Sequence, residues 1–173
     1  MGLFDKLTGT RRPSDGVVPL PVHEVRAALL ALGGPEVPWV VRDGAAEDAD
    51  LVAEWRIREP AWRTFFLRTQ VSELLQIRMR LLPDKREVRA VDRMWQVTWA
   101  GDTPRLALSA EAARGQMSVS TKSWTLGRGE GGEDGEDGPT QNFGVDTSDL
   151  KDPVRDTVLA AGWMWRGVAF GKL

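Results

Sequence analysis

Two alternating stretches joined by a short turn carry the strongest structural signal in this sequence. Residues 75–81 alternate apolar and polar side chains, residues 82–86 (LPDKR) are typical of a turn, and residues 87–99 run back with a β-like pattern. The apolar side of the first stretch consists of Leu75, Ile77, Met79 and Leu81. The pattern predicts a β-hairpin with one apolar face that must be buried against a second layer.

Other segments add strands and helices to this hairpin. Strands are predicted at 39–42, 51–58, 106–108, 117–124 and 162–170. Apolar side chains at helical spacing predict helices at 21–32 and 59–69. We expect a last helix to begin with Asp152 as its N-cap and Pro153 in its first position, and to end at Gly162.

The order of these segments favours an α+β fold. Strands in hairpins, with helices near the two ends, predict a single antiparallel β-sheet with two or three helices packed on it. The sequence lacks the strict alternation of strands and helices that a parallel doubly wound fold requires. We expect residues 1–16 to form an N-terminal tail and linker, and residues 17–173 to form a single domain.

The composition excludes several classes of chemistry. The chain has no cysteine or tyrosine, and its one histidine is His23. Disulfides, thiolate metal sites and cysteine nucleophiles are therefore excluded, and we expect neither a metal site nor a cofactor. The 23 basic and 25 acidic side chains leave a net charge of −2, which gives no global attraction to nucleic acid or membranes.

The expected location of the chain is the cytoplasm. The first sixteen residues lack the apolar core of a signal peptide, and no window approaches the length of a membrane-spanning segment. Residues 1–7 (MGLFDKL) form a short amphipathic segment, for which contact with a membrane surface is a minor alternative.

Residues 127–139 (GRGEGGEDGEDGP) combine many glycines with acidic side chains. The acids are Glu130, Glu133, Asp134, Glu136 and Asp137. This composition predicts a flexible, solvated loop, and the spacing of the acids does not match a calcium-binding EF-hand. One hypothesis from charge alone is that this acidic loop folds over a basic surface and competes with an anionic ligand there.

The segment from Arg56 to Arg93 has the opposite charge balance. It contains ten basic and five acidic side chains, and tryptophans interleave with the arginines. Such a surface can bind anions, or its arginine stems can simply cover apolar residues and pair with nearby carboxylates. The candidate ligand-binding residues are Arg56, Arg78, Arg80, Arg89, Asp92, Arg93, Trp95 and Trp99, and the residues considered to adjoin them are Trp163, Trp165 and Arg166.

Asp92 is the one carboxylate among these candidates. It lies in the middle of a predicted strand, where it is a catalytic or ligand-binding acid, the structural partner of an arginine such as Arg78, or a residue in a bulge. The sequence contains no phosphate-binding P-loop, no dinucleotide-binding glycine motif and no nucleophile elbow. We therefore assign no catalytic residue.

Two stretches, residues 87–99 (EVRAVDRMWQVTW) and residues 151–173 (KDPVRDTVLAAGWMWRGVAFGKL), together with residues 114–116 (RGQ), resemble a family of small bacterial proteins of uncharacterised function. The resemblance covers roughly the second half of the chain. It implies that the strand near the C-terminus belongs to the domain, and it implies no activity.

These observations favour a non-catalytic binding or interaction module whose Arg/Trp-rich surface contacts a protein or an anionic ligand. One alternative is a small enzyme that uses Asp92 or Glu54, with nearby arginines, on an anionic substrate. Another is a weak binder of single-stranded nucleic acid, which the overall charge disfavours.

Overall fold

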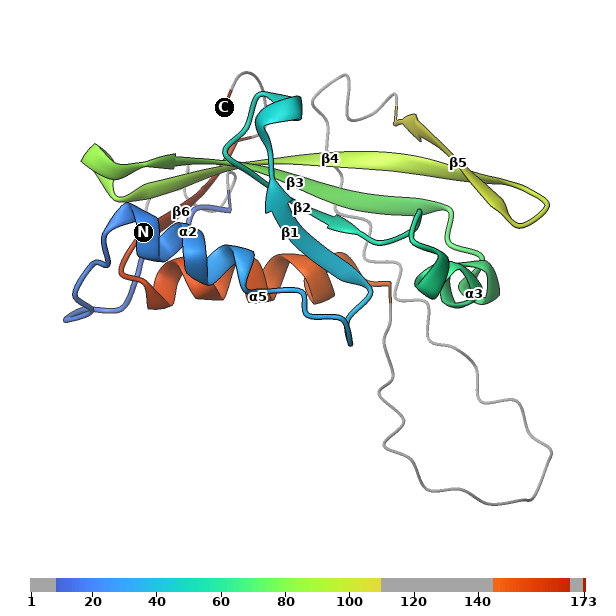
Figure 1. The fold of residues 1–173 in the computed structure, drawn as a ribbon. Coiled ribbons are helices and arrows are strands. Elements are labelled where there is room, and N and C mark those ends of the chain that lie inside the picture. The colour runs from blue at the N-terminus through green and yellow to red at the C-terminus, as the bar shows by residue number, and fades with distance from the viewer. Residues whose placement is uncertain (1–8, 110–144, 169–172) are drawn as a thin grey trace, which may run out of the picture.

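The computed structural model describes residues 9–109, 145–168 and 173. In chain order the helices and strands are α2 (Val22–Leu30), β1 (Trp39–Asp43), β2 (Leu51–Trp55), α3 (Pro60–Thr69), β3 (Glu73–Leu82), β4 (Glu87–Ala100), β5 (Thr103–Leu108), α5 (Thr147–Ala160) and β6 (Met164–Gly167). Two single turns of 3₁₀ helix, η1 (Ala45–Glu47) and η2 (Pro83–Lys85), lie between strands. The described residues thus form an α+β fold, as the sequence predicts (Figure 1).

A single six-stranded sheet organises these elements. Strands β1 to β5 lie side by side in chain order, and each neighbouring pair is antiparallel. Strand β6 pairs in parallel with Glu87–Ala90 of β4, beyond the segment of β4 that pairs with β5. The predicted antiparallel sheet is confirmed, and β6 adds one parallel pairing to it.

The hairpin predicted from the alternating stretches is β3–η2–β4. Its register runs without interruption from Glu73 opposite Gln96 to Leu82 opposite Glu87. Each of the four apolar side chains predicted to face inward is buried: Leu75, Ile77, Met79 and Leu81. The turn closes at Arg86, whose φ of +49° lies in the left-handed region.

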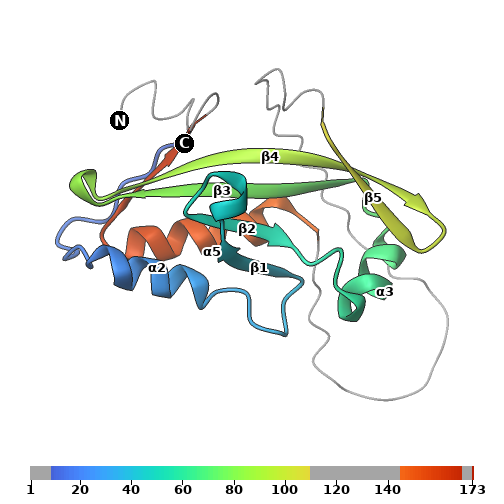
Figure 2. The ribbon, with the colours of Figure 1, turned by 45° about the horizontal axis from the view of Figure 1, so that its top comes forward.

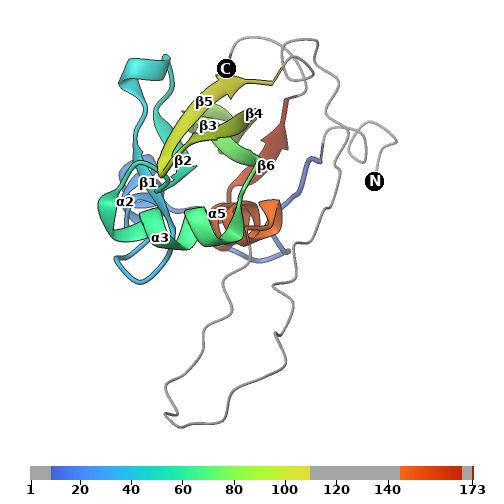
Figure 3. The ribbon, with the colours of Figure 1, turned by 90° about the vertical axis from the view of Figure 1, so that its right-hand side faces the viewer.

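Helices α2 and α5 cover one face of the sheet (Figures 1 and 2). The core between the layers includes Val25, Leu29, Val154 and Val158 from the helices and Leu51, Ala53, Ile77 and Met79 from the sheet. The opposite face, here called the open face, carries no helix among the described residues, and the η1 turn projects on that side (Figure 3). Helix α3 lies at the end of the sheet beside β5 (Figure 1).

The start of α5 corrects the sequence prediction. Asp146, and not Asp152, is the N-cap, because its side chain accepts a hydrogen bond from the Ser148 amide at 3.0 Å. Asp149 accepts in turn from the Asp146 amide at 3.3 Å, which completes a capping box. This box starts the helix before Pro153, which therefore lies inside it and not at its first position. The predicted stop at Gly162 is confirmed by a φ of +73° there.

Three predictions concern residues outside the described part of the chain: the amphipathic segment at 1–7, the strand at 117–124 and the acidic loop at 127–139. Within the predicted linker, Arg11 and Trp165 exchange two backbone hydrogen bonds of 2.8 and 2.9 Å. The chain ahead of α2 is therefore attached to the edge strand β6.

Candidate functional site

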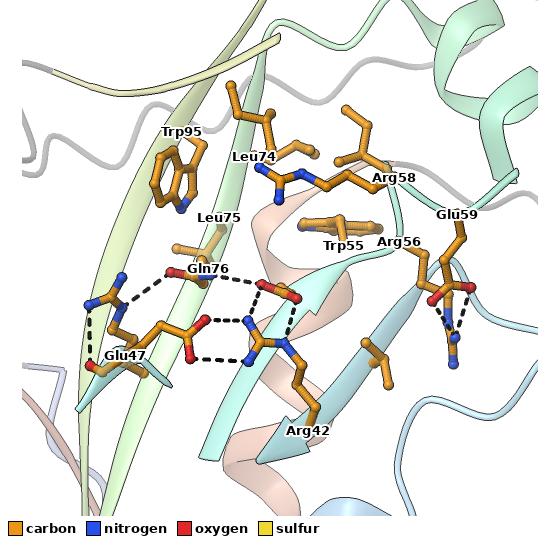
Figure 4. A pocket seen from close by; sticks show the side chains of 15 residues that line it. Arg42, Glu47, Trp55, Arg56, Arg58, Glu59, Leu74, Leu75, Gln76 and Trp95 are labelled. Atoms are coloured by element: carbon orange, nitrogen blue, oxygen red, sulfur yellow. Dashed lines mark hydrogen bonds and ion pairs between the residues drawn. The ribbon is translucent and has the colours of Figure 1, made fainter. Parts of the chain in front are cut away.

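A pocket of about 320 Å³ lies on the open face (Figure 4). Its apolar lining includes Trp55, Leu74, Leu75, Trp95 and Leu106. Four arginines (Arg42, Arg56, Arg58 and Arg78) and three glutamates (Glu47, Glu54 and Glu59) also line it. Apolar walls combined with a few placed polar groups are typical of small-molecule binding sites.

Arg42 of β1 forms the polar end of the pocket, between two carboxylates (Figure 4). Its Nε and Nη2 donate to Glu54 at 2.6 and 3.1 Å, and its Nη2 and Nη1 donate to Glu47 at 2.5 and 3.1 Å. The hydrogen bonds that Arg42 donates to Glu47 and Glu54 raise the pKa of Arg42, and those that Glu47 accepts from Arg42 lower the pKa of Glu47. Arg42 is therefore neutralised within the protein and serves to hold the site together.

Two further side chains extend this network across the sheet. Gln76 of β3 donates from Nε2 to Glu54 at 2.8 Å, and Arg78 donates from Nε to Oε1 of Gln76 at 3.2 Å. A longer bond of 3.4 Å runs from Nη1 of Arg78 to the carbonyl oxygen of Glu47. The network thus closes on itself through β1, β2, β3 and η1, and it fixes the rotamers on this side of the pocket.

Arg56 holds the opposite wall of the pocket. Its Nη1 donates to both carboxylate oxygens of Glu59 at 2.9 and 3.0 Å, while Nη2 donates to the carbonyl of Gly33 at 2.6 Å and Nε to that of Trp39 at 3.1 Å. The side chain is 15% exposed. Arg56 therefore joins the chain after α2 to the start of α3, and its donors are occupied.

Three arginines at the pocket form no ion pair with a carboxylate of the described residues: Arg58, Arg78 and Arg93, here called the arginine cluster. Arg58 is exposed, and its side chain lies between Trp55 and Leu74 with the guanidinium directed toward Trp95 (Figure 4). Arg93 of β4 lies directly opposite the pocket residue Gln76, on the same face. Its Nε is buried and has no hydrogen-bond partner within the described residues.

Trp95 forms the apolar wall next to the arginine cluster. It lies directly opposite Leu74 of β3 and Leu108 of β5, so these side chains form a row across three strands. The residue is half-buried, and its indole Nε1 is a buried donor for which the described part of the chain supplies no acceptor. A buried donor without an acceptor costs roughly 1–3 kcal/mol, which a bound ligand with an acceptor would offset.

The structure brings part of the predicted ligand-binding set together at this pocket. Arg56, Arg78 and Trp95 line it, and Arg93 borders it. The register also confirms that four of the predicted residues share one face of the hairpin: Arg78, Arg80, Arg89 and Arg93.

The other candidates make contacts within the protein. Arg80 pairs with Asp48, and Arg89 with the buried Glu87. Asp92 lies opposite Ile77 on the helix-covered face and forms an ion pair with Lys151 of α5, not with Arg78. Trp99 donates from Nε1 to the carbonyl of Val71 at 3.1 Å.

Of the C-terminal residues considered to adjoin the ligand surface, the two tryptophans are buried, whereas Arg166 lies directly opposite the candidate residue Arg89. Trp163 and Trp165 are 2% and 0% exposed and belong to the hydrophobic core, so these two side chains do not add to an exposed surface. Their indoles complete the packing of α5 on the sheet. Arg166 is directed toward Glu87, with Nη1 at 3.7 Å from the carboxylate.

The sequence interpretation missed several pocket residues, namely Arg42, Glu47, Arg58, Leu74, Gln76 and Leu106, and it considered Glu54 only as a possible catalytic acid. A signal for the network was present, because Arg42 and Glu54 lie in two consecutive predicted strands. Antiparallel pairing of those strands places both side chains on the open face. Glu47 had no such signal, because it belongs to the connecting turn.

Comparisons with protein-family models, with curated proteins and with solved structures found no match to this chain. The resemblance of residues 87–99 and 151–173 to a bacterial family therefore stays a prediction. Among the described residues no helix is long and apolar enough to cross a membrane. Nor do those residues contain a group of three or more side chains suited to hold a metal ion.

Proposed function

We propose that this chain is a non-catalytic binding module that holds a small anionic ligand in the open-face pocket. The observation that carries the proposal is the arginine cluster. Arg42 and Arg56 form close ion pairs with carboxylates at the same pocket. Arg58, Arg78 and Arg93 form no such ion pair in the described part of the chain, although Arg78 attracts the Glu47 carboxylate from a longer distance. An anion bound there would supply the missing counter-charge.

The distribution of acids supports binding in preference to catalysis. Asp92, the acid considered for an enzyme, is paired with Lys151 on the helix-covered face, away from the pocket. Glu54 does line the pocket, but its carboxylate accepts hydrogen bonds from Arg42 and Gln76. A general base needs a free position within hydrogen-bond reach of its substrate, and these bonds occupy most of the acceptor sites of Glu54.

The pocket size supports a small ligand. The pocket volume of about 320 Å³ lies at the lower end of the range for small-molecule sites. The walls contributed by Leu74, Trp95 and Leu106 suit an apolar part of the ligand. The expected ligand therefore has one anionic end and one apolar end.

The test is a fluorescence titration with 8-anilinonaphthalene-1-sulfonate, an anionic probe with an apolar body. We expect saturable binding by the wild-type protein and about a tenfold weaker affinity for the double variant Arg58→Gln/Arg93→Gln. Arg105→Gln is the matched control, because Arg105 is exposed and alternates with the pocket residue Leu106, so it lies on the other face of β5. Absent binding, or equal weakening by the double variant and the control, would contradict the proposal.

A further inference from the structure

We infer that the ligand of this pocket is a planar aromatic monoanion, with its ring against Trp95 and its anionic group among the arginine cluster. This inference rests on the proposed binding function and narrows it to one chemical class. It follows from the order of side chains along the open face.

The apolar part of the site is a flat row across three strands. Leu74, Trp95 and Leu108 lie directly opposite one another on β3, β4 and β5, and Leu106 adds to the lining from β5. Neighbouring strands are about 4.8 Å apart, so adjacent side chains of such a row touch and form a continuous platform. Leu108 is 41% exposed, so the platform is open to a ligand at its β5 end.

The cationic part of the site is the next row along the same strands. Gln76 and Arg93 follow Leu74 and Trp95 on the open face, two residues away in each strand. Two residues of a strand span about 6–7 Å, so an anionic group attached to one ring on the platform comes within reach of Arg93. Arg78 follows Gln76 on β3 and contributes a second guanidinium.

Two features favour a ligand whose apolar part is an aromatic ring over one whose apolar part is saturated. Trp95 is the half-buried aromatic member of the platform, and aromatic pairs gain about 0.5–1.5 kcal/mol beyond their buried area. Arg58 directs its planar guanidinium toward the Trp95 side of the pocket (Figure 4), where it can stack on the outer face of a bound ring. An aromatic ring between the Trp95 indole and the Arg58 guanidinium can stack on both groups, whereas a saturated ring can stack on neither.

The far end of the pocket limits the ligand to a single negative charge. Glu47 and Glu54 lie there and share one cation, Arg42, as their ion-pair partner, so these three side chains carry a net negative charge. A second anionic group placed at that end would be repelled by this net negative charge.

The test compares two carboxylates of the same connectivity by isothermal titration calorimetry. 2-Naphthoate is planar and aromatic, whereas decahydro-2-naphthoate is its saturated counterpart. We expect 2-naphthoate to bind the wild-type protein about three- to tenfold more tightly. Trp95→Leu should reduce that preference below about twofold, and Trp95→Phe should retain most of it, which separates ring stacking from simple filling of the site.

The outcomes distinguish this inference from the function on which it rests. Equal affinities for the two carboxylates, both weakened by Arg58→Gln/Arg93→Gln, would overturn the aromatic assignment and leave the anion-binding function intact. If neither carboxylate binds, both the aromatic assignment and the proposed anion-binding function are wrong. A preference that survives unchanged in Trp95→Leu would also overturn the inference, because the ring would then contact another part of the protein.

Discussion

Arg42 of β1 binds the carboxylate of Glu54 on the neighbouring strand with two nitrogens, Nε at 2.6 Å and Nη2 at 3.1 Å. The two residues are diagonal neighbours, since Arg42 lies opposite Val52 and Glu54 lies opposite Val40. The side chains are 34% and 29% exposed, so water screens this pair only in part. The pair joins β1 to β2 and, through Gln76, to β3.

Replacing Arg42 should destabilise the fold. In Arg42→Met the carboxylates of Glu47 and Glu54 lose their shared cation and remain partly buried. We expect the free energy of unfolding to fall by about 2 kcal/mol, between the values for exposed and fully buried pairs. Urea unfolding followed by circular dichroism measures this change.

Arg63→Met provides the matched control for this prediction. Its guanidinium lies 3.8 Å from Asp102, and both side chains are about half exposed or more. We expect a loss of about 0.5 kcal/mol or less. Equal losses in Arg42→Met and Arg63→Met would show that the pocket network does not stabilise the fold.

The Glu47 carboxylate should make stability depend on pH at the acid end. Hydrogen bonds from Arg42 lower its pKa in the folded state, so its stabilising effect is complete above the unfolded-state pKa and is lost as the pH falls through the folded-state pKa. We expect Glu47→Gln to be less stable than wild type at pH 6–8, and the difference to shrink below about pH 4. Thermal unfolding of both proteins at stepwise pH provides the measurement, and parallel curves down to pH 3 would contradict this account.

Gly162 should tolerate no side chain. Its φ is +73°, and a Cβ there would lie 2.7 Å from the Cα of Pro19, in the segment whose Leu20 amide donates to the carbonyl of Ala161. We expect Gly162→Ala to lower the free energy of unfolding by about 3 kcal/mol. Gly101→Ala is the control, because Gly101 also has a positive φ but no atom within 4 Å of the added Cβ, so we expect a loss of only about 1 kcal/mol. Similar losses would mean that the contact with Pro19 is unimportant.

The capping box of α5 makes a prediction that distinguishes two nearby aspartates. Asp146→Ala removes the side chain that accepts from Ser148, and we expect it to cost about 1 kcal/mol. Asp152→Ala removes only a partly exposed pair with Arg155 and should cost about 0.5 kcal/mol or less. Denaturant titrations of the two variants measure both losses. A larger loss in Asp152→Ala than in Asp146→Ala would instead support Asp152 as the N-cap, with the helix beginning at Pro153.

The strands and their faces were predictable because alternation is a local signal. Residues 75–81 show which side chains of β3 face inward, and the turn at 82–86 pairs β3 with β4. The helix start was harder to predict, since two aspartates lie ahead of helical sequence and the capping box at 146–149 begins the helix before Pro153 does. The parallel pairing of β6 with β4 was not predictable, because it joins segments far apart in the sequence.

The candidate site was predictable only in part. Composition identified an arginine- and tryptophan-rich segment, and Arg78, Arg93 and Trp95 within it do lie at the pocket. Which arginines are neutralised depends on partners from other segments: Arg56 finds Glu59 and the carbonyl of Gly33, whereas Arg80 finds Asp48. Sequence spacing does not encode such contacts, so the distinction between structural and available arginines required the fold.

The most direct test of the central claim is a ¹H–¹⁵N correlation spectrum of the indole N–H groups during titration with 2-naphthoate. The protein has eight tryptophans, and Trp95→Phe assigns the signal of Trp95. We predict a saturable shift of the Trp95 signal that is strongly reduced in Arg58→Gln/Arg93→Gln, while the signals of the buried Trp163 and Trp165 change little. A Trp95 signal that stays in place at saturating probe would contradict the assignment of this pocket as the ligand site.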